Sequence, residues 1–328
     1  MNRMRIIAPA RSPFMAKQVI SAGADEIYVG LRPIGPKQLS FDGRFQTVGG
    51  HSAHVEDGRS LEKIVNEAHR HGVPVQYCAN PYLLPRALEH QYLHHVERGL
   101  SAGVDSVHVS SLQTLKLMRK HFDNATKVTM GSQFGTVNEG HMRLLADHGV
   151  SAVVVSNALT LDELSELSKY GVALVVRGNL ESGGVPGYCR MIESPNSDQM
   201  GEGSRTRYEV RSDRRTSLAP YLDDAHDCNL CSLNDLLAAG VGAIKLLGRE
   251  APNPVTMAAV VALFREWLEL YGRQRAPHEI RRHMEQQSLL WTMRWKPRFC
   301  DQQRCCHGYN VDHNVSANNP RGARCGKN

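Results

Sequence analysis

Residues 149–156 read GVSAVVVS: a glycine, a branched residue, two short positions and a run of β-branched residues. The glycine follows a stretch of helical periodicity, and it can adopt the left-handed conformation that ends a helix. The run after it shows almost no polar alternation, which is typical of a parallel strand buried on both faces. This short unit therefore predicts a helix end followed at once by a buried strand.

The same unit recurs along the chain. It starts again at Gly23, Gly72, Gly103, Gly171 and Gly240. Two further strand-like segments, Arg5–Ala10 and Lys127–Gly131, lack the glycine. Eight strands alternating with helical segments over about 270 residues predict an α/β fold, a (β/α)₈ TIM-like barrel. A doubly wound open sheet is the alternative, but no glycine-rich phosphate-binding fingerprint follows any strand.

Several helices show a start signal in the sequence. Ser60, Ser111 and Ser232 are candidate N-caps, and Thr160 with Glu163 forms a capping box. The last barrel helix is expected to end near Gly272, so we predict a barrel over residues 1–272. Residues 273–328 are expected to form a basic, cysteine-containing C-terminal extension that packs on the barrel.

A barrel of this class places its active site at the C-terminal ends of the strands. Polar side chains at those positions are therefore the candidates for binding and catalysis. They are Asn80, Ser110, Ser132, Gln133, Asn138, Arg177, Lys245 and Arg249. Two long connections, residues 31–59 and 178–230, follow the second and seventh strands, and loops of that length are often functional.

Composition and charge limit the partners. The chain is 41% hydrophobic and 22% charged, and it has no apolar run long enough for a membrane span and no targeting segment, so we expect a cytoplasmic protein. Residues 273–328 hold eleven Lys and Arg against four Asp and Glu, a net charge of +7 in a chain of +6. This basic segment is either a solvated tail or a contact for an anion such as RNA.

Three cysteines, Cys189, Cys228 and Cys231, lie on the connection after the seventh strand. A second group follows the last helix: Cys300, Cys305, Cys306 and Cys325. Four thiolates suit an iron–sulfur cluster or a structural zinc site, and a thioredoxin-like redox pair or unliganded thiols are the other interpretations. Cys78, inside the third strand, is expected to be a buried apolar side chain.

Three segments resemble peptidase family U32, the collagenase-like proteins with a barrel domain, over roughly residues 4–272. The opening RIIAPARSPFMAKQVISAGADEIYVG is similar to the start of that family. The segment VTMGSQFGTVN matches its STQ…N strand at Ser132, Gln133 and Asn138. The segment NLCSLNDLLAAGVGAIKLLGRE matches at Cys231, Lys245, Gly248 and Arg249, and this match is the most specific.

The chain also departs from the family pattern. Cys189 keeps the second cysteine of the signature after the seventh strand, but Glu181 stands where the first is usual. The next family pair is missing from GEGSRTRYEV, whereas Cys228 is new beside Cys231. We therefore expect a rearranged metal site of Cys189, Cys228 and Cys231 with a fourth ligand from Cys300, Cys305 or Cys306.

The resemblance implies an oxygen-independent hydroxylase with a [4Fe–4S] cluster, acting on a small aromatic or quinone-type molecule or an RNA base, with prephenate as an oxygen donor in some members. Gln133, Lys245 and Arg249 are then the expected catalytic residues. The expected substrate-binding residues are Asn80, Ser132, Asn138, Arg177 and Arg190. For Lys245 and Arg249, a structural ion pair with Glu250 or Glu181 is the alternative role.

Three other functions stay open: a U32-type peptidase, a non-catalytic cluster-bearing partner of a homologous subunit, and an RNA-binding tail. Zinc is the alternative metal. No DNA partner is expected.

Overall fold

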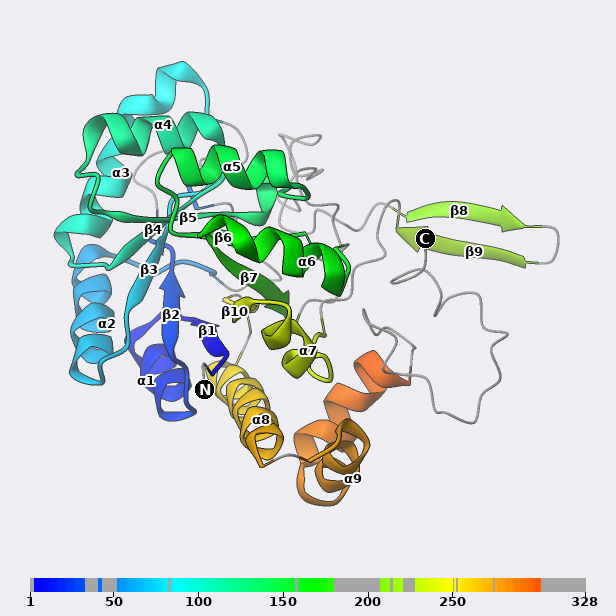
Figure 1. Cartoon of the computed structure of the whole chain (residues 1–328). Helices are drawn as coiled ribbons and strands as arrows, with labels where there is room; N and C mark the ends of the chain where they lie inside the picture. Colours follow the sequence, from blue (N-terminus) through cyan, green and yellow to red (C-terminus); the bar gives the residue numbers. More distant parts are fainter. Residues whose placement is uncertain are drawn as a thin grey trace.

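The computed structural model describes residues 3–32, 41–42, 52–81, 84–156, 159–179, 207–212, 215–220, 228–249, 251, 253–273 and 275–301. Eight parallel strands close into a barrel in the order β1-β10-β7-β6-β5-β4-β3-β2 (Figure 1). Their bounds are β1 Arg5–Pro9, β2 Glu26–Val29, β3 Val75–Cys78, β4 Ser106–Val109, β5 Lys127–Met130, β6 Ala152–Val154, β7 Ala173–Gly178 and β10 Val241–Leu246. The predicted (β/α)₈ barrel is confirmed, and the open doubly wound sheet is excluded.

The glycines of the repeated unit have the predicted backbone conformation. All six, including Gly72 and Gly149, have a positive φ. The backbone turns at each of them from a helix into the next strand, because a residue without Cβ enters the left-handed region at little cost. The repeat in the sequence is therefore a repeat of helix ends.

Helices surround the barrel (Figure 1). They are α1 Pro13–Ser21, α2 Gly58–Arg70, α3 Glu89–Ser101, α4 Leu112–His121, α5 Glu139–Asp147, α6 Leu161–Leu167, α7 Leu233–Ala238 and α8 Pro254–Gly272, with short 3₁₀ turns η1 Arg86–Leu88, η2 Ser132–Phe134 and η3 Ser168–Tyr170. Among the described residues, no helix is both long and apolar enough to cross a membrane.

Two of the four predicted helix starts are confirmed with their capping hydrogen bonds, one is confirmed in position only, and one was wrong. Ser111 caps α4, and Thr160 with Glu163 forms the capping box of α6. Ser232 precedes α7 but makes no capping hydrogen bond from its side chain. The prediction for Ser60 was wrong: Asp57 caps α2 by accepting from the Ser60 amide at 2.7 Å. Asp57 stands three residues before the amide that donates to it, which is the spacing of an N-cap, and the sequence alone did not rank Asp57 above Ser60.

The described part of the C-terminal extension packs on α8. It contains α9 Pro277–Gln287 and the π-helical segment η6 Trp291–Cys300. Trp291 lies against Trp267 with ring centroids 5.6 Å apart, and Trp295 lies edge-on to Phe264 at 5.4 Å. These side chains are all buried, so residues 275–301 complete the core beneath α8. The division at residue 272 remains a prediction.

The connection from β7 to α7 contains one described element, an antiparallel hairpin of β8 Arg207–Ser212 and β9 Arg215–Pro220. The sequence had indicated only a long loop there. Cys189 and Arg190, in the same connection, lie outside the described residues.

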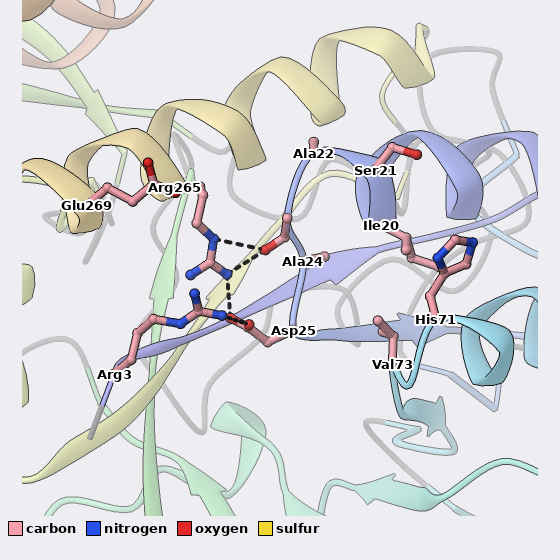
Figure 2. Close-up of a pocket in the computed structure, with 11 residues that line it drawn as sticks. Arg3, Ile20, Ser21, Ala22, Ala24, Asp25, His71, Val73, Arg265 and Glu269 are labelled. Carbon is pink, nitrogen blue, oxygen red and sulfur yellow. Dashed lines mark hydrogen bonds and ion pairs between the residues drawn. The ribbon is translucent and has the colours of Figure 1, made fainter. Parts of the chain in front are cut away.

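A pocket lies at the N-terminal end of the barrel, which we call the base (Figure 2). Two arginines, Arg3 and Arg265, both reach Asp25 there, each at 2.5 Å. Arg265 also donates from Nε to the Gly23 carbonyl oxygen at 3.1 Å. The arginines tie the turn before β2 to α8 and to the start of the chain, and every one of these contacts joins structural elements.

Candidate active site at the barrel mouth

Side chains fill the inside of the barrel, because alternate residues of each strand point inward. One apolar cluster belongs to this lumen: Ile7, Tyr28, Cys78, Val154, Val175 and Ala243. Cys78 is thus the buried apolar side chain that the sequence predicted. Polar residues at the same alternation occupy the rest of the lumen, and the C-terminal strand ends form what we call the mouth.

Lys245 is the central charge of the lumen. Its ammonium group donates to Gln76 Oε1 at 2.7 Å and lies 3.4 Å from His108 Nδ1. It also lies over the Tyr28 ring, 4.3 Å from the centroid. The side chain is only 5% exposed, so it reaches these partners from β10 across the interior of the barrel.

The network continues from Lys245 toward the base. Gln76 Nε2 donates to Thr129 at 3.0 Å and faces Glu26 at 3.4 Å, and Arg5 donates to Glu26 at 3.0 Å. Burial is the main cause that raises the pKa of Glu26, although Arg5 and Lys245 oppose it. Glu26, a carboxyl group with a raised pKa, thus lies on the base side of Lys245.

His108 faces the mouth from β4. Burial, and then the charges of Lys245 and Arg249, hold the pKa of His108 well below 6.5, so its ring is neutral at pH 7. A Cβ placed on Gly131 would lie 2.6 Å from His108 Nε2 and 2.3 Å from Gln133 Oε1. A side chain at this strand end would have to displace Gln133 or His108, so the glycine lets both side chains occupy the same space at the mouth.

Arg249 is held by a buried chain of polar groups. Its Nη1 donates to Asp42 Oδ2 at 2.7 Å, and Asp42 Oδ1 meets His54 Nε2 at 2.8 Å. The side chains of Asp42 and His54 are fully buried. Burial lowers the pKa of Arg249, but the Asp42 carboxylate, with Cys78 and Tyr28, raises it by more, so the guanidinium stays charged. The sequence had offered Glu250 or Glu181 as the partner; both lie outside the described residues, and the observed partner is Asp42.

Some buried polar atoms at the mouth have no hydrogen-bond partner among the described residues. They include Asn80 Oδ1, Gln133 Oε1 and Arg249 Nε. Asn80 is 7% exposed and Arg249 is 2% exposed, so solvent does not compensate for the missing bonds. Unsatisfied buried groups are costly and are concentrated at functional sites. Two acceptors and one donor at the same end of the barrel are what a polar ligand would satisfy.

The other predicted residues fall as follows. Ser132 begins η2 beside Gln133, and Arg177 lies at the end of β7, in register with Lys245. Ser110 donates to the Pro81 carbonyl oxygen. Asn138 is exposed and accepts from the His141 amide at 2.9 Å as the N-cap of α5, so the structure gives it a capping role. The prediction that it binds substrate has no support in these contacts.

The cysteines divide into two groups. Cys228 and Cys231 are 5% and 7% exposed and lie in the tight turn before α7. Between them, Asn229 has a positive φ and donates to the Arg177 carbonyl oxygen at 2.7 Å, which ties the turn to the end of β7. Both thiols pack in the hydrophobic core outside the barrel wall, rather than with the lumen cluster.

Cys300 ends η6 and is partly exposed, while Cys189, Cys305 and Cys306 lie outside the described residues. Within the described part of the chain, no three His, Cys, Asp or Glu side chains are grouped closely enough to hold a metal ion. Cys228 and Cys231 are therefore two candidate soft donors, and no other described side chain completes a group of three with them.

Sequence reasoning missed His108, Asp42, His54, Tyr28 and Gln76. His108, Tyr28 and Gln76 had a usable signal, because each is a polar or aromatic residue inside an otherwise apolar strand. Asp42 and His54 had none, since both belong to a connection whose course depends on the tertiary structure.

A family model described as peptidase family U32 matches residues 12–304. The chain belongs to peptidase family U32. The match extends through η6, so the described part of the C-terminal extension is inside the family region. A comparison with curated protein sequences gives no match.

Similar solved structures include the U32 peptidase Mk0906, with 14% identity and a TM-score of 0.47, covering 76% of this chain and 94% of that one. Dihydrodipicolinate synthase from Cyanidioschyzon merolae, with lysine bound, has 10% identity and a TM-score of 0.47, covering 84% and 78%. Phosphoribosylanthranilate isomerase from Thermotoga maritima has 11% identity and a TM-score of 0.45, covering 81% and 98%.

Proposed function

We propose that this U32 protein is an iron–sulfur-dependent, oxygen-independent hydroxylase-like enzyme, acting on a small aromatic or quinone-type molecule or on an RNA base. One observation carries the proposal: the Cys228–Cys231 turn is bonded to the end of β7, the strand whose Arg177 stands in register with Lys245. This hydrogen bond, from Asn229 to the Arg177 carbonyl oxygen, connects the turn that carries the two candidate metal ligands to the strand end that carries Arg177.

The donor set supports a metal with affinity for sulfur. Two buried thiols two residues apart suit an iron–sulfur cluster, with zinc as the alternative. Cys189 and one of Cys300, Cys305 or Cys306 are the proposed further ligands. When bound, the cluster would supply one-electron redox chemistry, with a potential set by burial and nearby hydrogen bonds.

The residues of the mouth have separate tasks in this proposal. Arg177, Arg249 and Lys245 attract an anionic oxygen donor, such as prephenate, through its carboxylates. Asn80 and Gln133 accept hydrogen bonds from the molecule to be hydroxylated and orient it. His108 is neutral at pH 7, so a ring nitrogen can accept the proton that leaves the hydroxylated carbon. Ser132 and Arg190 remain candidates for substrate contact.

The test is anaerobic purification followed by iron, sulfide and zinc analysis and an absorption spectrum. We expect about four iron and four sulfide per chain, as a [4Fe–4S] cluster requires, and loss of iron in Cys228→Ser and Cys231→Ser. The matched control is Cys78→Ala, which removes a buried thiol of the lumen and should keep the iron. A colourless protein with stoichiometric zinc would contradict the proposal, as would peptide hydrolysis that survives replacement of both cysteines.

A further inference from the structure

The lumen holds an amine in a setting that favours covalent chemistry. Lys245 is 5% exposed, and the contacts of its Nζ described above are with an amide oxygen, an imidazole nitrogen and the face of an aromatic ring. Enzymes activate lysines as nucleophiles by desolvation or by a neighbouring cation. Both conditions are present here, because the Arg249 guanidinium lies over the same Tyr28 ring at 5.9 Å.

The neighbouring arginine identifies the class of ligand. In the part of the chain that the structure describes, Arg249 Nε has no hydrogen-bond partner although the residue is 2% exposed, while Nη1 donates to Asp42. A buried guanidinium N–H without an acceptor is best satisfied by a carboxylate oxygen. A small molecule that offers a carboxylate to Arg249 and an adjacent carbonyl carbon to Lys245 is a 2-oxo acid.

We propose that Lys245 condenses with the carbonyl group of a small 2-oxo carboxylate bound by Arg249, forming an imine in the barrel mouth. The Nζ lone pair attacks the carbonyl carbon, and the C=O π electrons move to oxygen. The oxygen takes up protons and leaves as water, while the nitrogen loses its protons and forms the C=N bond. No oxidant or reductant is consumed.

His108 is placed to move these protons. Its Nδ1 lies 3.4 Å from Nζ, and its ring is neutral at pH 7, so it can take a proton from the amine and return it to the departing oxygen. Asn80 Oδ1, also buried and without a partner, can accept a hydrogen bond from the hydroxyl group of the intermediate. The site thus contains a nucleophile, a proton carrier and a carboxylate-binding group.

The inference takes the same mouth as the proposed function but does not need the cluster, so the two can fail separately. The experiment uses the full chain, once as purified and once after iron removal. Each sample is incubated with pyruvate, reduced with sodium borohydride and mapped by peptide mass spectrometry. We expect reductive alkylation of Lys245 in both samples, faster than at the exposed Lys169 of the same molecules, which is an internal control.

Two further arms separate imine formation from recognition of the carboxylate. Acetone lacks the carboxylate, so it should label Lys245 at least roughly tenfold more slowly than pyruvate. Arg249→Met should remove most of that difference, and Lys245→Arg should abolish labelling at this position. Labelling of Lys245 no faster than Lys169 in the wild-type chain would overturn the proposal, and equal rates with acetone and pyruvate would overturn the 2-oxo acid assignment.

Discussion

The two ends of the barrel use charge differently. At the base, Arg3, Arg265 and Asp25 pair with one another and with a backbone carbonyl (Figure 2). At the mouth, Lys245 donates to the Gln76 amide oxygen, and Arg249 donates to the Asp42 carboxylate. Each end also keeps a buried guanidinium N–H without a hydrogen-bond partner among the described residues, Nη1 of Arg265 and Nε of Arg249. The ends therefore differ in burial, because the Asp25 side chain is 16% exposed whereas that of Asp42 is fully buried. We expect substitutions at the base to change stability alone and substitutions at the mouth to change the proposed chemistry as well.

The largest expected effect comes from a glycine at the mouth. A Cβ on Gly30 would lie 1.8 Å from both Arg249 Nη1 and Asp42 Oδ2, so Gly30→Ala separates a buried ion pair. Breaking such a pair costs about 3–5 kcal/mol. The measurement is the free energy of unfolding from denaturant titration. Gly72→Ala is the control: Gly72 has a positive φ of 67° and open space around it, so only about 1–2 kcal/mol is expected. Equal losses in the two variants would contradict the role given to the mouth.

The second prediction concerns the loss of folding stability at acid pH. Burial lowers the pKa of His95 to about 4 from 6.5, so below pH 6.5 the unfolded chain binds a proton that the folded chain does not. Stability should therefore fall between pH 6.5 and about pH 4, by roughly 3 kcal/mol from this group alone. Denaturant titrations across that range test the slope. His95→Gln should flatten it, and an unchanged slope in that variant would exclude His95 as the cause.

Arg265→Gln should weaken the base without affecting the mouth. It removes a largely buried hydrogen-bonded charge from Asp25 and Gly23, and about 2–3 kcal/mol of stability should be lost. The rate of pyruvate labelling at Lys245 should stay as in the wild type. Altered labelling would show that the two ends are coupled, against the separation drawn here.

The smallest effect is expected at Arg3. Its side chain is 62% exposed, so its contact with Asp25 is screened by solvent, and Arg3→Ala should cost less than about 1 kcal/mol. The comparison with Arg265→Gln at the same carboxylate isolates the effect of burial. A loss as large as that of Arg265→Gln would show that both arginines are needed to hold the turn.

Much of this arrangement could be predicted from the sequence. The glycine-strand unit predicted six of the eight barrel strands, and the strand-like segments Arg5–Ala10 and Lys127–Gly131 predicted the other two. The polar residues predicted at strand ends included Lys245, Arg249, Asn80 and Gln133. These predictions succeed because strand periodicity and helix ends are local properties. The prediction of the α2 N-cap failed because Asp57 and Ser60, three residues apart, are both suited to cap a helix.

The sequence by itself determined the barrel and the family to which the chain belongs, since these follow from short-range patterns and motif spacing. Only the tertiary structure decided which groups meet. Asp42 lies 207 residues from Arg249, and Gln76 lies 169 residues from Lys245. Such partners are chosen by how strands close around a common axis and how a connection folds back over it. No local sequence pattern predicts these partners, because hydrogen bonds between distant residues depend on the packing of the whole barrel.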